Sequence, residues 1–426
     1  MNYEYLIIGG SAGGIGAIEA IREIDKVGSL AVIAEELTPQ YSKPMISEYL
    51  SEGAKAFNHI MYRPKKFWKE NSVEILSGKK AISMEPKEKN VTLEDNTKIG
   101  FKKLLIVTGG QPIIPKMEGS SRKGVYTFTS LNDARLILDD LSNSDRIIVI
   151  GGGLIGVSLA EALMKLNKQV TIIELKEKIL NLILDPTGSD LVTDVVQQSG
   201  VKIVTGHSAV AITGRKDSEN RVGGIVLDNG LILDCDIVVF AIGVKPRTEI
   251  LDPNRIKINH GVIVDRHMAT SIPDIYACGD VAEAFDFLLK DSRPLPLWPL
   301  AYIGGRVAGS NMAGKKIEYP GGTQMSALNY FGLPVISAGI INPHQDDAYE
   351  IISELNKEHR VYKKIVIRDN IIHGFILIGK IGNAGILFDL LKRKINIENM
   401  KETILSNDFG LIHLTPTVRQ EMLRRK

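Results

Sequence analysis

Cysteine is almost absent from this chain, which has only Cys235 and Cys278 among its 426 residues. Two thiols far apart in the sequence cannot hold an iron–sulfur cluster by cysteine ligation, and they form no CxxC or CxxxxC redox pair. The eight histidines show no spacing typical of metal ligands. We therefore expect no metal site and no redox chemistry between neighbouring cysteines.

An excess of charge of one sign is also missing. The sequence has 52 basic and 50 acidic residues, which gives a net charge of +2. Because nucleic-acid-binding proteins normally carry a basic stripe, this balance argues against nucleic acid as a main partner. No apolar run is long enough to span a bilayer, and the N-terminus shows no basic leader followed by an apolar segment. We expect a cytoplasmic protein of two or three domains.

Two glycine-rich turns are the most informative feature that is present. Gly9 to Gly14 form the first and Gly151 to Gly156 the second, and each follows an apolar, strand-like segment. In such a turn the first glycine permits the tight bend, the second lets the backbone approach a pyrophosphate, and the third permits close helix–strand packing. The helix that follows offers free N–H groups and a partial positive charge to the phosphates. Two such turns predict two dinucleotide pockets.

The two turns differ in how fully they match this pattern. The second has all its glycines, whereas the first has Ser11 at the middle position, where a small residue is tolerable. A tight strand-to-helix turn without a ligand is the alternative for either turn, and the duplication argues against it. The residues expected to contact the two pyrophosphates are Gly9, Ser11, Ala12, Gly13, Gly14, Gly151, Gly153, Ile155 and Gly156.

Each turn is followed by a second strand that ends in a carboxylate, Glu35 in the first copy and Glu174 in the second. Such an acid accepts hydrogen bonds from ribose hydroxyls and repels a 2′-phosphate, so Glu174 favours NADH over NADPH. Lys176 and Lys178 follow closely and temper that preference. Glu36 is adjacent to Glu35 and could take its role, and each acid could instead be a solvated strand end.

The two turns also open similar series of elements, which indicates an internal repeat. Each series continues with a short strand, a meander with a polar turn, and a β-branched strand that ends in glycine, at Gly109 or Gly243. β-branched closing strands are typical of parallel strands buried on both faces. The predicted fold class is α/β, with two Rossmann-like, three-layer ββα domains in doubly wound sheets and a C-terminal α+β domain.

Proline and glycine mark the expected domain boundaries. We predict a first nucleotide-binding domain of residues 1–113 and 246–320, an inserted second one of residues 114–245, and a C-terminal domain of residues 321–426. The further elements expected are a helix near 301–313, strands at 362–367 and 371–378, and helices at 384–394 and 398–405.

Several segments of residues 1–320 together resemble the FAD-dependent pyridine nucleotide–disulfide oxidoreductase family, in particular its branch of NADH:rubredoxin and ferredoxin reductases and NADH oxidases. They are the first glycine turn with Glu35, Thr108–Gly110, Ala241–Gly243 with Pro246, and Ile275–Asp280. The resemblance implies FAD in the first domain and NAD(H) in the second. It also implies that Thr108, Gly109, Gly243, Gly279 and Asp280 contact the cofactors, and that Cys278 is a buried structural position.

One segment, Tyr41–Met45, departs from the disulfide-reducing members of this family, which carry a redox cysteine at the position of Lys43. A relay through sulfur needs a thiol, so we exclude disulfide or peroxide reduction by that route. The segment resembles instead the rubredoxin and ferredoxin reductases, and this resemblance places Lys43 and Pro44 against the flavin. A cation there stabilises reduced, anionic flavin, which makes Lys43 the candidate catalytic residue. The alternative is an exposed loop lysine.

Two further positions bear on the resemblance. Trp298 resembles the tryptophan of a Trp-x-x-Ala segment near the flavin in ferredoxin-reductase relatives, where it would shield the ring or line the electron exit. Packing in the core is an equal alternative. Ser158 stands where many relatives carry a glutamate near the nicotinamide, and Glu161, one helical turn later, is expected to be an ordinary helix residue.

The resemblance implies a flavoprotein NADH dehydrogenase. Hydride would pass from NADH to FAD, and electrons would then pass to a small rubredoxin- or ferredoxin-type carrier or to a partner subunit. Because the C-terminal region forms a dimer interface in relatives, a homodimer is expected. The alternatives are an NADH oxidase that uses O2, the FAD- and NAD-binding subunit of a larger complex, and a nucleotide-binding redox sensor that is not an enzyme.

Overall fold

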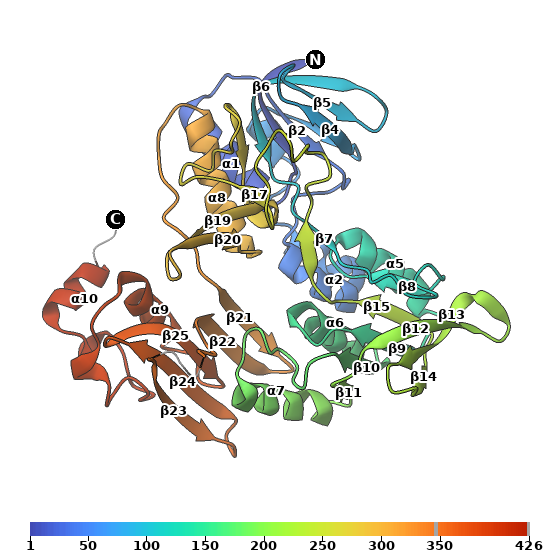
Figure 1. Cartoon of the computed structure of the whole chain (residues 1–426), viewed down its shortest axis with the longest axis vertical. Coiled ribbons are helices and arrows are strands. Elements are labelled where there is room, and N and C mark those ends of the chain that lie inside the picture. Colours follow the sequence, from blue (N-terminus) through green and yellow to red (C-terminus); the bar gives the residue numbers. More distant parts are fainter. Residues whose placement is uncertain (345–347, 424–426) are drawn as a thin grey trace. The chain divides into compact units, whose positions relative to one another are not determined.

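The computed structural model describes residues 1–344 and 348–423, which fall into two units (Figure 1). The first unit comprises Met1–Ile113, Thr129–Leu138 and Val244–Gly322, and the second comprises Ile114–Phe128, Asp139–Gly243 and Thr323–Lys426. In the part of the chain that the structure describes, no helix has both the length and the hydropathy that a bilayer crossing needs. The division into three domains stays a prediction, because compactness alone does not separate the C-terminal region from the second unit.

A seven-stranded sheet forms the centre of the first unit. Its strands are β1 (Asn2–Ile8), β2 (Leu30–Ala34), β3 (Val73–Ser77), β4 (Ala81–Glu85), β5 (Asn90–Leu93), β6 (Lys98–Ile106) and β18 (Ile275–Ala277). The order is β3-β2-β1-β6-β5-β4, and β18 pairs with the C-terminal end of β6. Strands β1, β2, β3, β6 and β18 pair in parallel, whereas β4 and β5 form an antiparallel meander. The apolar runs of β1, β2 and β6 are buried in the core of this unit.

The helices of the first unit are mostly short apart from two. The 3-10 helices are η1 (Lys43–Met45), η2 (Gly53–Ala56) and η3 (Gly279–Val281), and the α-helices are α1 (Ala12–Ile24), α2 (Ile46–Glu52), α3 (Phe57–Ile60), α4 (Phe67–Glu70), the first residues of α5 (Leu131–Leu141) and α8 (Trp298–Met312). The remaining strands are β7 (Gly110–Pro112), β16 (Val244–Pro246), β17 (Val262–Ile263), β19 (Ala282–Asp286) and β20 (Asp291–Pro294). Strands β7 and β16 pair antiparallel, so the two chain segments that flank the insertion lie side by side.

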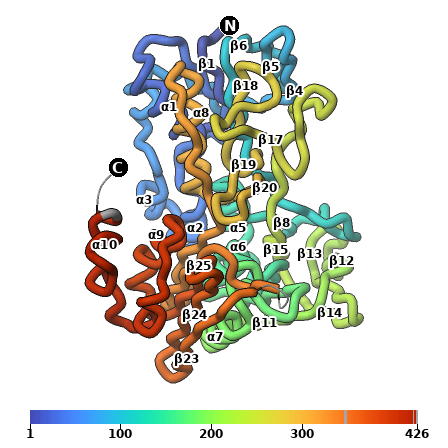
Figure 2. Tube along the Cα trace, turned by 60° about the vertical axis from the view of Figure 1, so that its left-hand side comes forward, coloured from blue at the N-terminus to red at the C-terminus, as the bar shows by residue number. Residues whose placement is uncertain are grey.

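Helices α1 and α8 come from distant parts of the chain and pack closely together (Figure 2). A Cβ atom on Gly305 would collide with the Gly13 carbonyl oxygen, and one on Gly309 would collide with the Ala17 carbonyl oxygen. Small residues at this crossing therefore let the two helix backbones touch. The glycine turn at the start of α1 is thus supported by a segment almost 300 positions later in the chain.

The part of the second unit that contains the second glycine turn repeats this architecture. Its parallel sheet has the order β11-β10-β9-β15-β8, and its second sheet is the antiparallel β12-β13-β14. The strands are β8 (Val125–Thr127), β9 (Arg146–Ile150), β10 (Gln169–Glu174), β11 (Lys202–Thr205), β12 (Ala209–Arg215), β13 (Ser218–Leu227), β14 (Ile232–Asp234) and β15 (Ile237–Phe240), and the helices are α6 (Leu154–Lys165) and α7 (Pro186–Gln198). Each glycine turn therefore lies between a central strand of a parallel sheet, β1 or β9, and the helix that follows it.

The C-terminal part of the second unit is an antiparallel sheet with the order β21-β22-β25-β24-β23. The elements are β21 (Met325–Tyr330), β22 (Leu333–Gly339), β23 (Glu350–Asn356), β24 (Val361–Arg368), β25 (Ile371–Ile378), α9 (Ala384–Arg393), η4 (Glu398–Met400), η5 (Leu411–His413) and α10 (Pro416–Leu423). Helix α9 packs on β25 through its buried leucines.

The predicted fold class is confirmed: the chain has two α/β parts of one type and a C-terminal sheet with helices. The helix expected at 398–405 is wrong, because only the single turn Glu398–Met400 forms there. Ile397, Met400 and Ile404 are buried with helix-like spacing, but successive local turns satisfy the backbone instead. An apolar period of three or four residues does not distinguish a helix from a series of turns.

The α1–α8 contact predicts the effect of one added methyl group. Gly309→Ala should lower the free energy of unfolding by about 1–3 kcal/mol, because the helices must move apart to admit it. Denaturant unfolding measures this change. The matched control is Gly385→Ala in α9, where a Cβ would meet nothing within 4 Å and where alanine at this exposed position should stabilise the helix slightly. Equal effects of the two substitutions would contradict the close contact.

Candidate functional site

The first glycine turn leaves the N-terminus of α1 free. Gly9 has φ +121°, and a Cβ there would collide with the Val107 carbonyl oxygen. A Cβ on Gly14 would collide with the Gly9 carbonyl oxygen, so helix and strand touch at this point. Ser11 is the N-cap residue, but its side chain makes no capping hydrogen bond, and the first turn, which holds Ala12 and Gly13, contains no acid. The N–H groups of this turn are available to an anion.

The second turn shows the same constraints and one informative difference. Gly151 has φ +111° with the Ala241 carbonyl oxygen 2.5 Å from its Cβ position, and a Cβ on Gly156 would collide with the Gly151 carbonyl oxygen. Gly153, the N-cap residue of α6, has an ordinary φ of −82° and nothing within 4 Å of its Cβ position. The fold therefore does not require a glycine there. The space beside Gly153, with Ile155 in the adjoining helical turn, fits the close approach of a pyrophosphate.

The carboxylate of Glu174 is held beside this second turn. It accepts hydrogen bonds from the Gly152 N–H at 2.7 Å and from the Lys176 N–H at 2.9 Å, one on each oxygen. Each oxygen keeps a second lone pair for a ribose hydroxyl. The acid at the end of β10 is therefore fixed in orientation, and it also braces the glycine turn.

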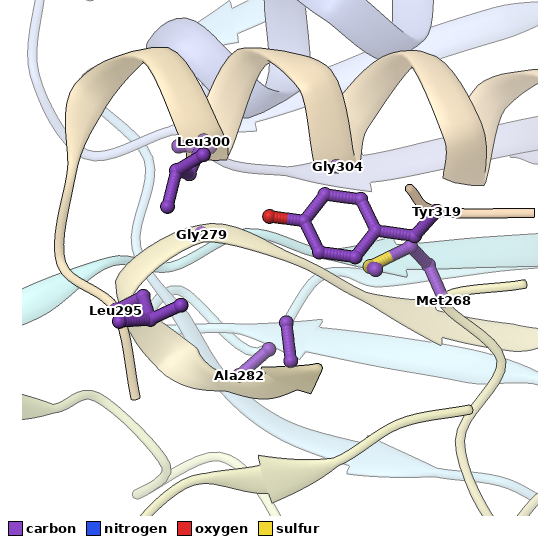
Figure 3. Close-up of a pocket in the computed structure, with 9 residues that line it drawn as sticks. Met268, Gly279, Ala282, Leu295, Leu300, Gly304 and Tyr319 are labelled. Carbon is purple, nitrogen blue, oxygen red and sulfur yellow. The ribbon is translucent and has the colours of Figure 1, made fainter. Parts of the chain in front are cut away.

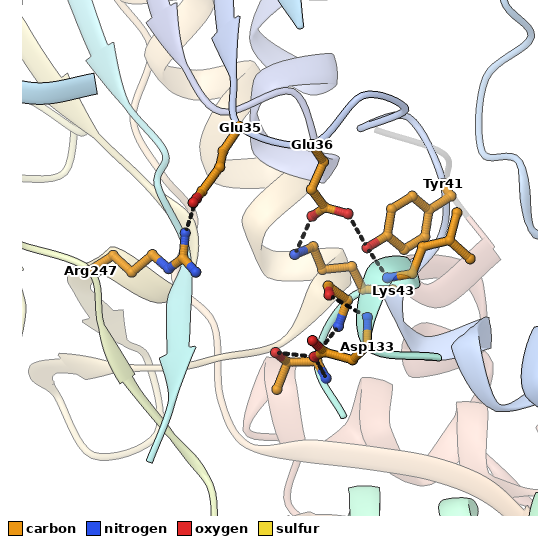
Figure 4. A network of polar contacts seen from close by, with 9 residues as sticks. Glu35, Glu36, Tyr41, Lys43, Asp133 and Arg247 are labelled. Atoms are coloured by element: carbon orange, nitrogen blue, oxygen red, sulfur yellow. Dashed lines mark hydrogen bonds and ion pairs between the residues drawn. The ribbon is translucent and has the colours of Figure 1, made fainter. Parts of the chain in front are cut away.

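The corresponding pair of acids in the first unit, Glu35 and Glu36, point to different partners (Figure 4). The Glu35 carboxylate lies 2.6 Å from the Arg247 guanidinium and 3.9 Å from the Lys80 ammonium. The Glu36 carboxylate accepts a hydrogen bond from the Tyr41 hydroxyl and pairs with Lys43. Both acids therefore have partners within the chain, and these contacts do not decide between them. The role of Glu35 at a ribose stays a prediction.

Lys43 belongs to a fixed polar network and is only partly exposed (Figure 4). Its ammonium lies 3.1 Å from Glu36, and the Tyr41 hydroxyl donates to the other Glu36 oxygen at 2.6 Å. The same hydroxyl accepts the Leu131 N–H at 2.9 Å, and burial raises the pKa of Tyr41 well above its ordinary value. Pro44 follows in the short helix η1 and fixes the backbone there. Lys43 is therefore a positioned cation.

Asp280 lies within electrostatic reach of this cation. Burial raises the pKa of the Asp280 carboxyl, and the Lys43 ammonium lowers it in part. Its neighbour Gly279 has φ +74°, and a Cβ there would lie 3.2 Å from the Ala301 side chain. The motif Cys278–Asp280 therefore meets the first turn of α8, and its carboxylate senses the charge of Lys43.

The pocket near this motif is apolar (Figure 3). Gly279, Leu295, Leu300 and Tyr319 are among its lining residues, and the Tyr319 hydroxyl points into it. Neither Lys43 nor Asp280 lines this pocket. The charged groups of the candidate site therefore lie outside this pocket. We interpret the pocket as a packing gap beneath α8 and not as part of the site.

Trp298 begins α8 and packs edge-on against the Tyr62 ring, with ring centroids 4.2 Å apart. Its indole Nε1 is buried and has no hydrogen-bond partner in the part of the chain that the structure describes. A buried N–H without a partner costs free energy, so this donor is suited to a hydrogen bond with an acceptor atom of a bound cofactor. The packing with Tyr62 and a position facing a cofactor are compatible, and the two interpretations of Trp298 no longer exclude each other.

The two backbone segments that resemble the family's flavin- and nicotinamide-side turns are open. Gly109 and Gly243 have φ of +74° and +107°, and neither has an atom within 4 Å of its Cβ position. Beside the first, the Thr108 hydroxyl donates to the Arg247 carbonyl oxygen at 2.7 Å. The open faces of these turns fit the edge of a bound ring system, and the roles of Thr108, Gly109 and Gly243 stay predictions.

Both cysteines are inert by position. Cys235 and Cys278 are buried, and burial raises the pKa of each thiol to about 12. A thiol with such a pKa forms almost no thiolate at neutral pH. Among the described residues, no group of three or more His, Cys, Asp or Glu side chains could hold a metal ion.

Three contacts of this site were not predicted from the sequence. Arg247 pairs with Glu35 across more than 200 positions, and Tyr41 with Glu36 fixes Lys43. Glu161 was expected to be an ordinary helix residue, but it accepts the Phe331 N–H at 3.1 Å and so ties α6 to the β21–β22 hairpin. No signal in the sequence could have found the first and third contacts, because they join distant segments. The closeness of Glu36, Tyr41 and Lys43 in the sequence could have suggested the second.

The family model "Pyridine nucleotide-disulphide oxidoreductase" matches residues 3–305. The model "Rubredoxin NAD+ reductase C-terminal domain" matches residues 325–395. The first match contains both glycine turns, and the second contains most of the C-terminal sheet.

Individual relatives agree with these matches. The chain is 27% identical over 411 residues to the NADH-dependent phenylglyoxylate dehydrogenase subunit epsilon of Aromatoleum evansii, with 96% of each chain covered. It is 30% identical over 323 residues to the NADH oxidase of Methanocaldococcus jannaschii, covering 74% of this chain and 71% of the relative. It spans about half the length of two relatives from Bacillus subtilis.

A solved structure is similar over almost the whole chain. The NADH:rubredoxin oxidoreductase of Clostridium acetobutylicum has a TM-score of 0.76 and 25% sequence identity, and the match covers 94% of this chain and 97% of that one.

The open space beside Gly153 predicts a selective effect. Gly153→Ala should raise the NADH concentration for half-maximal flavin reduction by about tenfold, because the methyl group displaces the pyrophosphate. A tenfold change corresponds to a loss of about 1.4 kcal/mol of binding free energy. The thermal unfolding midpoint should stay unchanged, since nothing lies within 4 Å of the new atom. In contrast, Gly156→Ala should lower the midpoint. An unchanged NADH dependence in Gly153→Ala would contradict a pyrophosphate at this turn.

Proposed function

The chain belongs to the pyridine nucleotide-disulphide oxidoreductase family, and on this premise we propose that it is a flavoprotein NADH dehydrogenase that reduces a small electron-carrier protein. It is an oxidoreductase whose cofactors are FAD and NAD(H), as its family implies. One observation carries the proposal: the two glycine turns are built alike, and the second keeps a glycine at position 153 that the fold itself does not require.

The first unit has the residues to hold FAD. The free N-terminus of α1 would hold the pyrophosphate, Glu35 would bind a ribose, and Asp280 with Thr108–Gly109 would contact the remainder of the cofactor. When bound, the flavin supplies hydride acceptance and the release of single electrons. The chain's own contribution is to orient the two nucleotides and to exclude water, because hydride transfer needs no general acid or base.

Lys43 supplies the positive charge of this site. Glu36 and Tyr41 hold its ammonium in place, so little reorganisation is needed when negative charge develops nearby. Because both thiols of the chain are buried and protonated, no sulfur relay operates. Electrons that enter from NADH must leave directly from the first unit.

The acceptor in this proposal is a rubredoxin- or ferredoxin-type carrier. The match of residues 325–395 to a rubredoxin reductase C-terminal domain and the similarity to an NADH:rubredoxin oxidoreductase support it. The homodimer, the cytoplasmic location and the three domain ranges complete the proposal as predictions from the sequence.

Specific relatives favour two other functions. The archaeal relative is named an NADH oxidase, which supports O2 as acceptor. The relative matched over almost its whole length is a subunit of an NADH-dependent dehydrogenase, which supports a role as the NADH-binding subunit of a complex. A nucleotide-binding sensor without turnover is the alternative outside the enzymes.

An anaerobic stopped-flow experiment separates these functions. Mixing with NADH should bleach the flavin absorbance within seconds, and oxidised rubredoxin or ferredoxin should then restore it. If O2 alone restores the colour, the carrier hypothesis fails. If NADH does not bleach the flavin, an NADH dehydrogenase activity is ruled out, and the alternative of a nucleotide-binding sensor is favoured. Co-purification with a cluster-bearing subunit would identify a complex.

The fixed carboxylate of Glu174 predicts a cofactor preference. NADH should reduce the flavin with a kcat/KM at least about tenfold higher than NADPH, because the acid repels a 2′-phosphate. Glu174→Gln should narrow this ratio, since it removes the charge and keeps an acceptor for the Gly152 N–H. Steady-state kinetics with both nucleotides measure the ratio. A preference for NADPH in the unmodified protein would contradict the role given to Glu174.

A further inference from the structure

The second unit contains a set of buried charges that the proposed reaction does not use. Asp185, Lys363 and Lys364 are all buried, and buried charges persist only when they are paired. The Lys364 ammonium lies 2.9 Å from Asp185 Oδ2, and the Tyr362 hydroxyl donates to the same oxygen at 2.6 Å. Asp185 directly precedes α7, whereas Tyr362 and Lys364 lie on β24. We name these three residues, Asp185, Tyr362 and Lys364, the Asp185 cluster.

The cluster attaches α7 to the C-terminal sheet, because Asp185 precedes α7 and its two partners lie on β24. Figure 1 shows α7 beside this sheet. The other oxygen of Asp185 accepts the Gly188 N–H at 2.9 Å and so caps α7. A Cβ on Gly188 would lie 3.2 Å from the Ile378 side chain of β25, so the first turn of the helix rests on the sheet. The Asn342 side chain adds a hydrogen bond of 3.1 Å to the Leu184 carbonyl oxygen. The end of segment 179–185 is therefore fixed by the C-terminal sheet.

The beginning of the same segment contacts the second glycine turn. The Leu180 N–H donates to the Gly152 carbonyl oxygen at 2.8 Å, and the Ile179 side chain lies 2.7 Å from the Cβ position of Gly152. Leu180 is buried with φ +54°, a backbone conformation that leucine rarely adopts. Such strain persists only where the surroundings enforce it. Segment 179–185 is therefore held at both ends, by the glycine turn and by the Asp185 cluster.

We propose that the C-terminal sheet completes the NAD site, and that Lys364 and Tyr362 act through Asp185 as positioning residues for the second glycine turn. The inference rests on the proposed function in taking this turn as the NAD site. A loop that must be ordered on binding lowers affinity, so a fixed segment 179–185 increases the affinity for the dinucleotide. The sheet then contributes to NADH binding without touching NADH.

The test compares NAD+ binding by isothermal titration calorimetry in the full chain loaded with FAD. Tyr362→Phe removes one hydrogen bond to Asp185, and the double variant Asp185→Asn, Lys364→Met removes both charges together. Each should raise the Kd for NAD+ by about threefold to tenfold, the equivalent of one lost hydrogen bond. The flavin absorption spectrum should stay unchanged. If the double variant does not fold, Tyr362→Phe decides alone.

The matched control is Lys363→Met. Lys363 is a neighbour on the same strand and is as deeply buried, but its ammonium binds Leu405 and Asn407, which both lie in the C-terminal region. This variant removes a buried cation from β24 without affecting Asp185. The Kd of this variant for NAD+ should stay within about twofold of the unmodified value, a smaller change than one lost hydrogen bond causes. This should hold even if the unfolding midpoint falls.

Hydrogen exchange supplies a readout that a merely structural role would not move. The Leu180 amide should exchange faster in Tyr362→Phe than in the unmodified protein, and at the unmodified rate in Lys363→Met. The inference is overturned if the Kd is the same in all variants, if Lys363→Met raises it equally, or if the Kd rises without faster exchange at Leu180. An unmodified protein that binds no NAD+ would instead contradict the proposed function.

Discussion

Both nucleotide-binding sheets depend on one constraint, an approach of backbone to backbone that leaves no room for a Cβ atom. It occurs between strand and strand where Gly9 meets Val107 and Gly151 meets Ala241, and between strand and helix where Gly14 and Gly156 meet the first glycine of each turn. These contacts hold the N-terminus of each helix at the carboxyl end of its sheet. The anion-binding ends of α1 and α6, and hence both candidate cofactor sites, follow from that placement.

Side chains then make the two sites unequal. In the first unit a positioned cation, Lys43, lies near Asp280. The indole N–H of Trp298, which has no hydrogen-bond partner among the described residues, belongs to the same unit. In the second unit the polar groups serve the turn itself, because Glu174 accepts two backbone N–H groups and segment 179–185 rests against Gly152. The first arrangement suits a resident, redox-active group, and the second suits a nucleotide that binds and leaves.

The repeat, the α/β class and the ends of most strands could be predicted from the sequence, because glycine turns and β-branched runs are local signals. The prediction of a helix at 398–405 was wrong, since the spacing of buried apolar residues alone does not specify the backbone conformation. The pairing of Arg247 with Glu35, of Phe331 with Glu161 and of Lys364 with Asp185 could not be predicted. Each joins residues more than 150 positions apart, and one sequence carries no register for such contacts. These contacts depend on which distant segments the topology of the fold brings together.

The contact between α1 and α8 has a consequence for how the chain is made. The first unit is discontinuous, and the helix after its glycine turn packs on residues near position 305. A ribosome therefore completes residues 139–243 before it delivers the segment that the first unit needs for closure. Domains generally fold as units during synthesis. The contact that supports the first glycine turn can therefore form only after the whole of residues 139–243 has been synthesised.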